Sequence, residues 1–229
     1  MRIRRKLKVG IVRFPGSNCD FDTLNYFRKF GHKPFFIWYR DTKFPPLDLL
    51  VLPGGFAFGD RSYKQATGAY TIDPGKLALK SPVMKIIRSV ARSGIPILGI
   101  CNGFQILVKA RLLPGKLTQN DSQKFFCDYT DCEVTGTSFF HDKSLLGKTY
   151  SIPVAHGYGK YTASKIEVSK LVKNGQIFLR YKGFNPNGST ANIAGVSNKA
   201  KTIFGMMPHP ERSPNGECFA RAIEKYARR

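Results

Sequence analysis

One segment, Ile95-Pro-Ile-Leu-Gly-Ile-Cys-Asn-Gly-Phe-Gln-Ile-Leu-Val-Lys-Ala110, joins a short apolar run, two glycines around a cysteine, and a second apolar run. The first run has the length of a buried strand, and the second has the length and period of a helix. The spacing Gly99-Ile-Cys-Asn-Gly103 matches a nucleophile elbow, in which a reactive side chain sits on a sharp strand-to-helix turn. The glycines allow that turn without Cβ clashes. The segment therefore predicts a strand, a Cys101 thiol held clear of the sheet, and a helix in succession.

The predicted position of Cys101 favours a thiolate. The first turn of a helix has free backbone N–H groups and the positive end of the helix dipole, and both stabilise negative charge. A buried structural cysteine after a strand is the alternative, because free cysteines are often buried. The strand, the two glycines and the helix all agree with an elbow, so we interpret Cys101 as a nucleophile.

Strand and helix patterns alternate on both sides of the elbow. Strands are expected over residues 7–14, 34–39, 47–52 and 95–100, and helices over 21–30, 83–93 and 101–110. Later segments predict antiparallel strands at 125–134, 150–154 and 176–181, a buried strand at 202–207 and a last helix at 217–228. The alternation predicts an α/β fold with a mostly parallel sheet, helices on both faces and added antiparallel strands.

A second motif, Met206-Met-Pro-His-Pro-Glu-Arg212, supplies a candidate base. The prolines around His209 disfavour a helix, so we expect an extended chain there. In an extended chain residues two apart point to the same side, which lets Glu211 orient His209. A histidine between prolines is by itself more often a loop residue. The elbow, 209 − 101 = 108 positions earlier, makes His209 the predicted base.

The glycines of Pro53-Gly-Gly-Phe-Ala-Phe-Gly-Asp60 follow a predicted strand. Ligands of α/β sheets bind at the carboxyl ends of the strands, where such a loop exposes backbone N–H groups. We predict the Gly55 and Asn102 amides as oxyanion donors and Gly54 as a substrate contact. A phosphate cradle is the competing interpretation, but neither common phosphate-binding glycine pattern is present.

Length and composition predict one globular domain over residues 1–229, with a basic extension at residues 1–7. The hydrophobic fraction is 42%, and no apolar run reaches the roughly 18 residues of a membrane span. The five cysteines are odd in number and form no Cys-x-x-Cys pair, which argues against a disulfide framework and a zinc site. We therefore expect no metal and a reducing cytoplasm.

The formal net charge of +22 suggests a basic nucleic-acid-binding module as an alternative function. Only the N-terminal segment is densely basic, and the other Lys and Arg residues are scattered. We therefore expect a solvated basic surface, or one that attracts an acidic partner or phosphorylated metabolites, and do not expect a nucleic-acid partner.

The elbow and the distal His-Pro-Glu together resemble the class I (triad) glutamine amidotransferases. Longer strings narrow the resemblance to the glutaminase subunits of phosphoribosylformylglycinamidine synthases over about residues 8–212. These strings include Phe14-Pro-Gly-Ser-Asn-Cys-Asp20, Cys101-Asn-Gly-Phe-Gln-Ile-Leu107 and Gly205-Met-Met-Pro-His-Pro-Glu-Arg212. The resemblance implies a flavodoxin-like three-layer sandwich.

The resemblance also implies a role for each matching residue. Cys101 corresponds to the nucleophile, His209 to the acid/base and Glu211 to its orienter. Gln105 corresponds to a residue that holds the substrate glutamine, although an exposed helix position is an equal alternative. His156 is either a substrate contact or a structural hydrogen-bonding residue.

The implied activity is glutamine hydrolysis to glutamate and ammonia. Ammonia would pass to a large synthetase subunit that uses ATP and magnesium in purine biosynthesis, with a small accessory subunit as a further candidate partner. The chain itself is expected to bind no cofactor. Alternatives are an amidotransferase subunit of another pathway, such as guanylate or anthranilate synthesis, and a cysteine peptidase on a similar sheet.

Two segments depart from the family pattern. Tyr158 stands after His-Gly, where the family often has glutamate. The string Arg61-Ser-Tyr-Lys-Gln-Ala-Thr-Gly68 replaces the commoner Leu-Arg-Ala-Gly, and the loop is longer. We expect the loop and the positive charge to affect the partner interface more than the chemistry.

Overall fold

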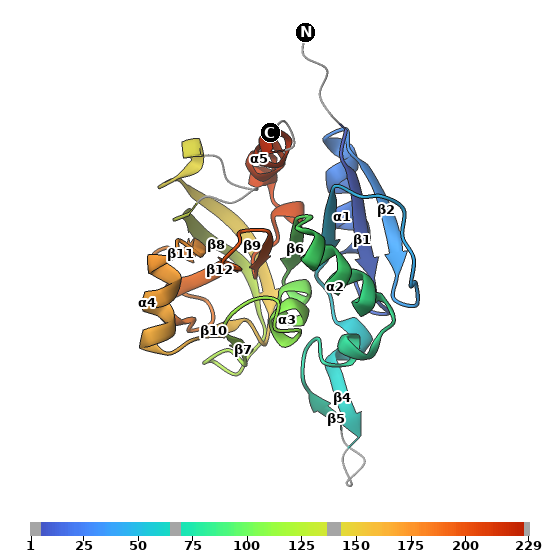
Figure 1. Ribbon diagram of the computed structural model, residues 1–229. Helices are drawn as coiled ribbons and strands as arrows, with labels where there is room; N and C mark the ends of the chain where they lie inside the picture. The colour runs from blue at the N-terminus through green and yellow to red at the C-terminus, as the bar shows by residue number, and fades with distance from the viewer. Residues whose placement is uncertain (1–5, 65–69, 137–142, 227–229) are drawn as a thin grey trace.

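A nine-stranded sheet runs through the computed structural model, which describes residues 6–64, 70–136 and 143–226. The strand order is β2-β1-β3-β6-β13-β12-β11-β8-β9. The parallel half contains β2 (Lys33–Trp38), β1 (Lys8–Arg13), β3 (Leu49–Leu52), β6 (Ile97–Ile100) and β13 (Ile203–Met206). The antiparallel half contains β12 (Ile193–Ser197), β11 (Ile177–Tyr181), β8 (Phe126–Val134) and β9 (Thr149–His156). Figure 1 shows the two halves beside each other.

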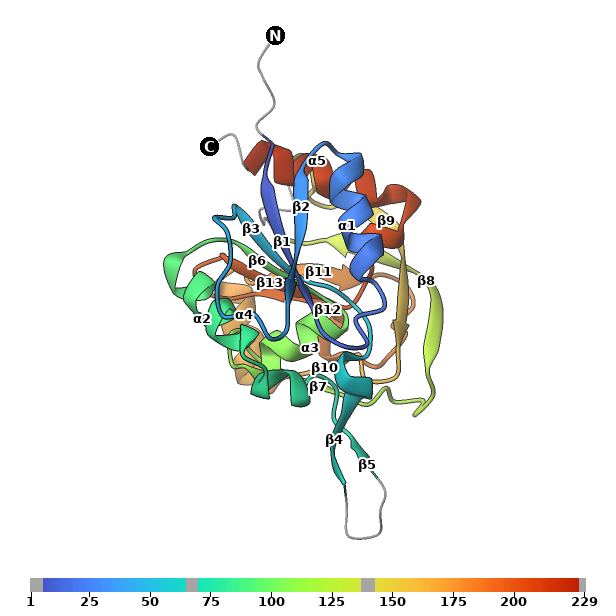
Figure 2. The ribbon, with the colours of Figure 1, turned by 90° about the vertical axis from the view of Figure 1, so that its right-hand side faces the viewer.

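Helices cover both faces of the parallel half, so the sheet is the middle layer of a three-layer sandwich. Figure 2 shows α1 (Asp20–Lys29) and α5 (Glu217–Tyr226) on one face, with α2 (Val83–Ser93) and α3 (Asn102–Lys109) on the other. The predicted α/β fold, with its parallel sheet, elbow and added antiparallel strands, is confirmed. None of the helices in the described residues is long and apolar enough to span a bilayer.

The predicted element boundaries differ from the structure in a few places. Helix α1 begins at Asp20, with Cys19 as its N-cap, one residue before the predicted start at residue 21. The elements that were missed include α4 (Lys165–Lys173), the strand β12 and the short strands of the two small sheets described below. The Ser164–Glu167 capping box of α4 is a local sequence signal that identifies such a helix start. Leu7, the last residue of the predicted extension, is buried in the core, and residues 1–5 lie outside the described residues.

Two small two-stranded sheets lie outside the main sheet in the described residues. Strands β7 (Lys116–Thr118) and β10 (Lys160–Thr162) pair antiparallel beside α3. Strands β4 (Arg61–Lys64) and β5 (Tyr70–Ile72) pair antiparallel and project from the body in Figures 1 and 2. The segment Arg61–Gly68, which departs from the family pattern, therefore begins with strand β4. Residues 65–69 lie outside the described part of the chain.

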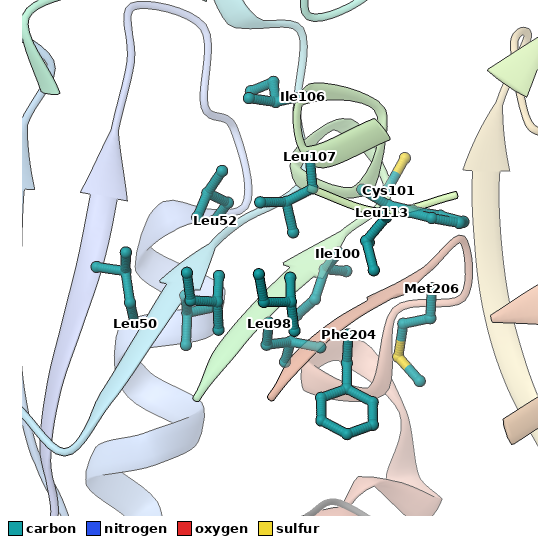
Figure 3. Packing of buried hydrophobic residues seen from close by; sticks show 14 of the residues in the cluster. Leu50, Leu52, Leu98, Ile100, Cys101, Ile106, Leu107, Leu113, Phe204 and Met206 are labelled. Carbon is teal, nitrogen blue, oxygen red and sulfur yellow. The ribbon is translucent and has the colours of Figure 1, made fainter. Parts of the chain in front are cut away.

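Apolar side chains of β3, β6 and β13 pack against α3 and hold the elbow in place. Figure 3 shows this cluster, in which Leu52, Leu98 and Leu107 meet beneath the turn. The sulfur of Cys101 points away from it. The core therefore fixes the backbone at Cys101 and leaves the thiol available to other groups.

The elbow glycines are required by close backbone approach. Neither Gly99 nor Gly103 has a positive φ. A Cβ on Gly103 would lie 2.0 Å from the Leu52 carbonyl oxygen, and one on Gly99 would lie 2.7 Å from Gly103 backbone atoms. Separations below 3.0 Å force atoms apart. The small residues thus let α3 pack directly on β3 and β6.

Gly103→Ala is therefore expected to lower the free energy of unfolding by about 3 kcal/mol, because the methyl group would displace packed backbone. Chemical denaturation measures this change. Gly157→Ala is the matched control: its added Cβ would meet nothing nearer than a Phe125 ring atom at 3.7 Å, and its φ is not positive. Equal stability of the two variants would contradict the packing explanation.

Candidate active site

Cys101 occupies the turn between β6 and α3 in a strained conformation. Its φ is 49° and its ψ is −104°, a region that non-glycine residues rarely adopt. The first helical hydrogen bond runs from the Gln105 amide to the Cys101 carbonyl oxygen at 3.1 Å. The Asn102 and Gly103 amides donate no hydrogen bond within the described part of the chain. Negative charge that develops beside Cys101 therefore faces free N–H groups at a helix start.

His209 and Glu211 form a buried pair beyond the end of β13. The His209 Nδ1 lies 2.7 Å from the Glu211 Oε1, and both side chains are almost fully buried. The predicted pairing is present, but the reason given for it was wrong. Pro210–Arg212 is a 3-10 turn with proline at its first position, so the chain is not extended there. The turn brings the carboxylate back onto the imidazole.

The thiol and the imidazole are neighbours but do not form a well-aligned hydrogen bond. The Cys101 Sγ lies 3.6 Å from the Ala155 carbonyl oxygen, to which it donates. The His209 Nε2 is buried and has no hydrogen-bond partner. Strand β9 holds both groups, since the His209 amide donates to the Pro153 carbonyl oxygen at 2.8 Å. With the Nδ1 on the carboxylate, the Nε2 is left to accept a proton from the thiol.

Electrostatics favour a protonated His209. Burial lowers the pKa of this imidazole, but the Glu211 carboxylate and, after it, the neighbouring Cys101 sulfur raise the pKa by a larger amount. The balance holds the pKa of His209 well above its ordinary value of 6.5. The imidazolium that results is the proper counterion for a thiolate, as in other cysteine–histidine sites.

The loop after β3 approaches the same place. A Cβ on Gly54 would lie 2.5 Å from the His209 Cε1, so the imidazole packs on bare backbone there. Gly55 has a φ of 140° and a Cβ on it would lie 2.5 Å from the Asn18 amide nitrogen. The Gly55 amide donates no hydrogen bond within the described residues, as expected of an oxyanion donor.

The Asn102 side chain joins this loop to the elbow. Its Oδ1 accepts from the Ala57 amide at 3.1 Å. Its Nδ2 donates to the Asp60 Oδ1 at 3.0 Å and to the Gln105 Oε1 at 2.9 Å. Gln105 in turn donates to the Tyr158 carbonyl oxygen at 2.8 Å. The two segments that carry the predicted oxyanion amides are therefore held together by one buried amide.

Gln105 and His156 are both buried. The interpretation of Gln105 as an exposed helix position was therefore wrong. The His156 Nε2 lies 3.4 Å from the Asn187 Nδ2, and its Nδ1 has no hydrogen-bond partner. Burial lowers the pKa of His156 to about 4, so this ring is neutral at pH 7.

A cavity of about 210 Å³ opens beside the elbow. Of the predicted site residues, four line it and four lie outside its wall. The lining ones are Gly55, Cys101, Gln105 and His156, and the others are Gly54, Asn102, His209 and Glu211. The cavity has room for an amino acid and brings it against the thiol. It also has an apolar edge that includes Phe56.

Sequence reasoning missed two residues at the site. Cys19 lies beside His209, and ligand atoms of Cys19, His209 and Glu211 are within 4.8 Å of one another. Three such residues could hold a metal ion. Because His209 and Glu211 already share a 2.7 Å hydrogen bond, we interpret them instead as a catalytic base and its orienting acid, with the Cys19 thiol beside them. The second residue, Asp60, lines the cavity. Cys19 stands in a string that carried the family resemblance, and Asp60 ends the glycine-rich loop predicted to face the ligand; these were the available signals.

Comparison with known proteins agrees with this geometry. Residues 6–222 match the family model of the CobB/CobQ-like glutamine amidotransferase domain. The phosphoribosylformylglycinamidine synthase subunit PurQ of Nostoc sp. is 41% identical over 209 residues, which are 90% of this chain and 89% of that protein. The chain belongs to the PurQ family of glutamine amidotransferases.

Other PurQ relatives show the same coverage. The PurQ subunit of Methanosarcina mazei is 40% identical over 217 residues, with 90% of this chain and 89% of that protein covered. The structure of PurLQS from Thermotoga maritima contains a chain with a TM-score of 0.85 and 34% identity. The match covers 97% of this chain and 100% of that one. The PurQ resemblance seen in the sequence motifs is thus confirmed.

Proposed function

We propose that this chain is the glutaminase subunit of a phosphoribosylformylglycinamidine synthase. The observation that carries the chemistry is an elbow cysteine at a cavity wall, with a buried His209–Glu211 pair beside it. The PurQ relatives, about 40% identical over nine-tenths of the chain, give the pathway as purine biosynthesis. The substrate is glutamine, and the products are glutamate and ammonia.

In the first half of the reaction the Cys101 thiolate attacks the side-chain amide carbon of glutamine. The amide oxygen becomes an oxyanion, which the Gly55 and Asn102 N–H groups stabilise. Removal of one such donor typically costs about 3 kcal/mol in the transition state. The His209 imidazolium donates its proton to the departing nitrogen, and ammonia leaves a γ-glutamyl thioester on Cys101.

The second half regenerates the thiol. His209, now neutral, takes a proton from water as the water oxygen attacks the thioester carbon. The carbon–sulfur bond breaks, glutamate leaves, and the Cys101 sulfur again pairs with the imidazolium. Glu211 holds the imidazole orientation through both steps and stabilises its charged form.

The ammonia is used by a large synthetase subunit, and a small accessory subunit is a further partner. This chain binds no cofactor, and the synthetase subunit uses ATP and magnesium. We place the complex in the cytoplasm and treat residues 1–229 as one domain. The five free cysteines, three of them buried, support a reducing compartment.

The proposal is tested by mixing the chain with a synthetase subunit and following formylglycinamidine ribonucleotide. We expect glutamine to support product formation only when both proteins are present, whereas ammonium salts support it with the synthetase alone. An absence of glutamine-dependent product with an active, bound synthetase would contradict the proposal.

The isolated chain is expected to be a poor glutaminase. The structure gives the reason: the Cys101 thiol donates to Ala155 and leaves the His209 Nε2 without a partner. Binding of the synthetase would reorient the thiol toward the imidazole. We expect at least a roughly tenfold rise in glutamate release on adding saturating synthetase. Equal rates with and without synthetase would show that the free site is already active.

A further inference from the structure

The cavity beside Cys101 has one carboxylate in its wall. Apart from Asp60, its lining side chains are apolar or carry polar groups such as those of Cys101, Gln105, His156 and Tyr158. No Lys or Arg is among them, and His156 is neutral at pH 7. Asp60 is therefore the one acidic side chain of the cavity within the described part of the chain.

A bound glutamine places specific demands on this wall. Its amide carbon must reach the Cys101 sulfur, which leaves its α-ammonium and α-carboxylate elsewhere in the cavity. An ammonium group removed from water needs an opposite charge or several acceptors, because an unpaired buried ion is costly.

We propose that Asp60 accepts the α-ammonium of the substrate and thereby selects for an α-amino acid. The proposal rests on the glutaminase function proposed above. Asp60 is one hydrogen bond away from Asn102, the residue that follows the nucleophile. A glutamine whose side-chain amide reaches Cys101 can therefore place its α-ammonium near this carboxylate in the same cavity.

The loop geometry presents Asp60 firmly. Phe58, Gly59 and Asp60 have φ values of 56°, 70° and 55°, so three successive residues are left-handed. The Asp60 carbonyl oxygen accepts from the Asp73 amide at 2.8 Å, which fixes the backbone. A carboxylate has about four acceptor positions. The Asn102 side-chain amide and the Gly75 N–H donate to the Asp60 carboxylate, so acceptor positions remain for an ammonium group.

The raised pKa of Asp60 is consistent with a carboxylate that has no positive partner until substrate binds. Burial raises the pKa of this carboxyl to about 7, against the lowering effects of the Asn102 and Gly75 hydrogen bonds. Among the side chains that the structure describes, no cation offsets this desolvation, unlike at Asp73, where Lys109 and Lys76 lower the pKa. A substrate ammonium would supply the charge that the free protein lacks.

The test is a comparison of two substrates in the complex with its synthetase. Glutaramic acid has the glutamine side-chain amide and carboxylate but lacks the α-amino group. We expect Asp60→Asn to lower kcat/KM for glutamine by about 100-fold, as for loss of one partner of a buried ion pair. We expect it to change kcat/KM for glutaramic acid by less than about threefold. Where turnover of glutaramic acid is slow, its inhibition constant against glutamine gives the same comparison.

Asparagine keeps the side-chain oxygen that accepts from Asn102 and tolerates the left-handed backbone. Because the pKa of Asp60 is raised in the folded state, the stability it gives is lost as pH rises through about 7. The variant should therefore unfold at a temperature no lower than the wild type at pH 8. Asp73→Asn is the matched control, since this neighbouring carboxylate is paired with lysines and does not line the cavity.

Each outcome has a distinct meaning. Equal losses on both substrates would overturn the proposal and show that Asp60 acts only by positioning Asn102. Unchanged glutamine kinetics, or wild-type protein that uses both substrates equally well, would also overturn it. Failure of the proposed glutaminase function would appear differently, as wild-type protein inactive on glutamine in the presence of synthetase.

Discussion

Replacement of Cys101 by alanine is expected to abolish glutamine-dependent product formation and to leave ammonia-dependent formation intact. Without the sulfur no γ-glutamyl thioester can form. Loss of such a nucleophile typically lowers kcat by about 10⁴-fold or more. The measurement is formylglycinamidine ribonucleotide production by the complex with glutamine or with ammonium chloride as nitrogen donor.

The alanine variant should fold, because the Cys101 sulfur points away from the apolar cluster beneath the elbow. Circular dichroism and binding to the synthetase check this. Cys127→Ala is the matched control, since Cys127 is a free cysteine exposed on β8. It should retain wild-type rates with both nitrogen donors. Substantial glutamine-dependent turnover by Cys101→Ala would refute the assignment of the nucleophile.

The second large effect is expected for Glu211→Gln. The substitution preserves size but removes the charge that lies 2.7 Å from the His209 Nδ1. A neutral amide also allows the imidazole to hold the wrong tautomer. The equivalent change in serine-protease triads lowers kcat by about 10⁴-fold. We therefore expect a loss of roughly 10³- to 10⁴-fold in glutamine-dependent kcat, with ammonia-dependent activity retained.

A titration separates this electrostatic role from a packing role. Glu211 is the largest influence that raises the pKa of His209 against the lowering effect of burial. Removal of its charge should therefore shift the His209 titration, followed by NMR of the ring, toward lower pH. Glu133→Gln, an acid on β8 paired with Lys182, is the control and should change neither quantity. A retained His209 pKa with full activity would exclude Glu211 as the orienting group.

Much of the parallel half could be predicted because its signals are local. The helix over Val83–Ser93 was placed at both ends, since an apolar face of helical period ends at Gly94, which has a left-handed conformation. The elbow was equally clear, because a strand, two glycines and a helix follow each other without a gap. Such features depend on residues that are neighbours in the chain.

The contacts that organise the site could not be predicted in the same way. Asn102 joins Ala57, Asp60 and Gln105 through one side chain, and nothing in the spacing of these residues fixes those distances. The His209–Glu211 pair was predicted on the premise of an extended chain, and a 3-10 turn produced the same contact. Short segments between prolines admit both conformations, and tertiary packing selects one.

The sheet order has a consequence for how the site is made. Strands β6 and β13 are neighbours, yet β8, β9, β11 and β12 are all encoded between them. A ribosome therefore releases Cys101 long before His209, and the two meet only when this intervening block has folded. A nascent or truncated chain carries the cysteine without its base. The cysteine and its base are therefore both present only after the last part of the chain has been made.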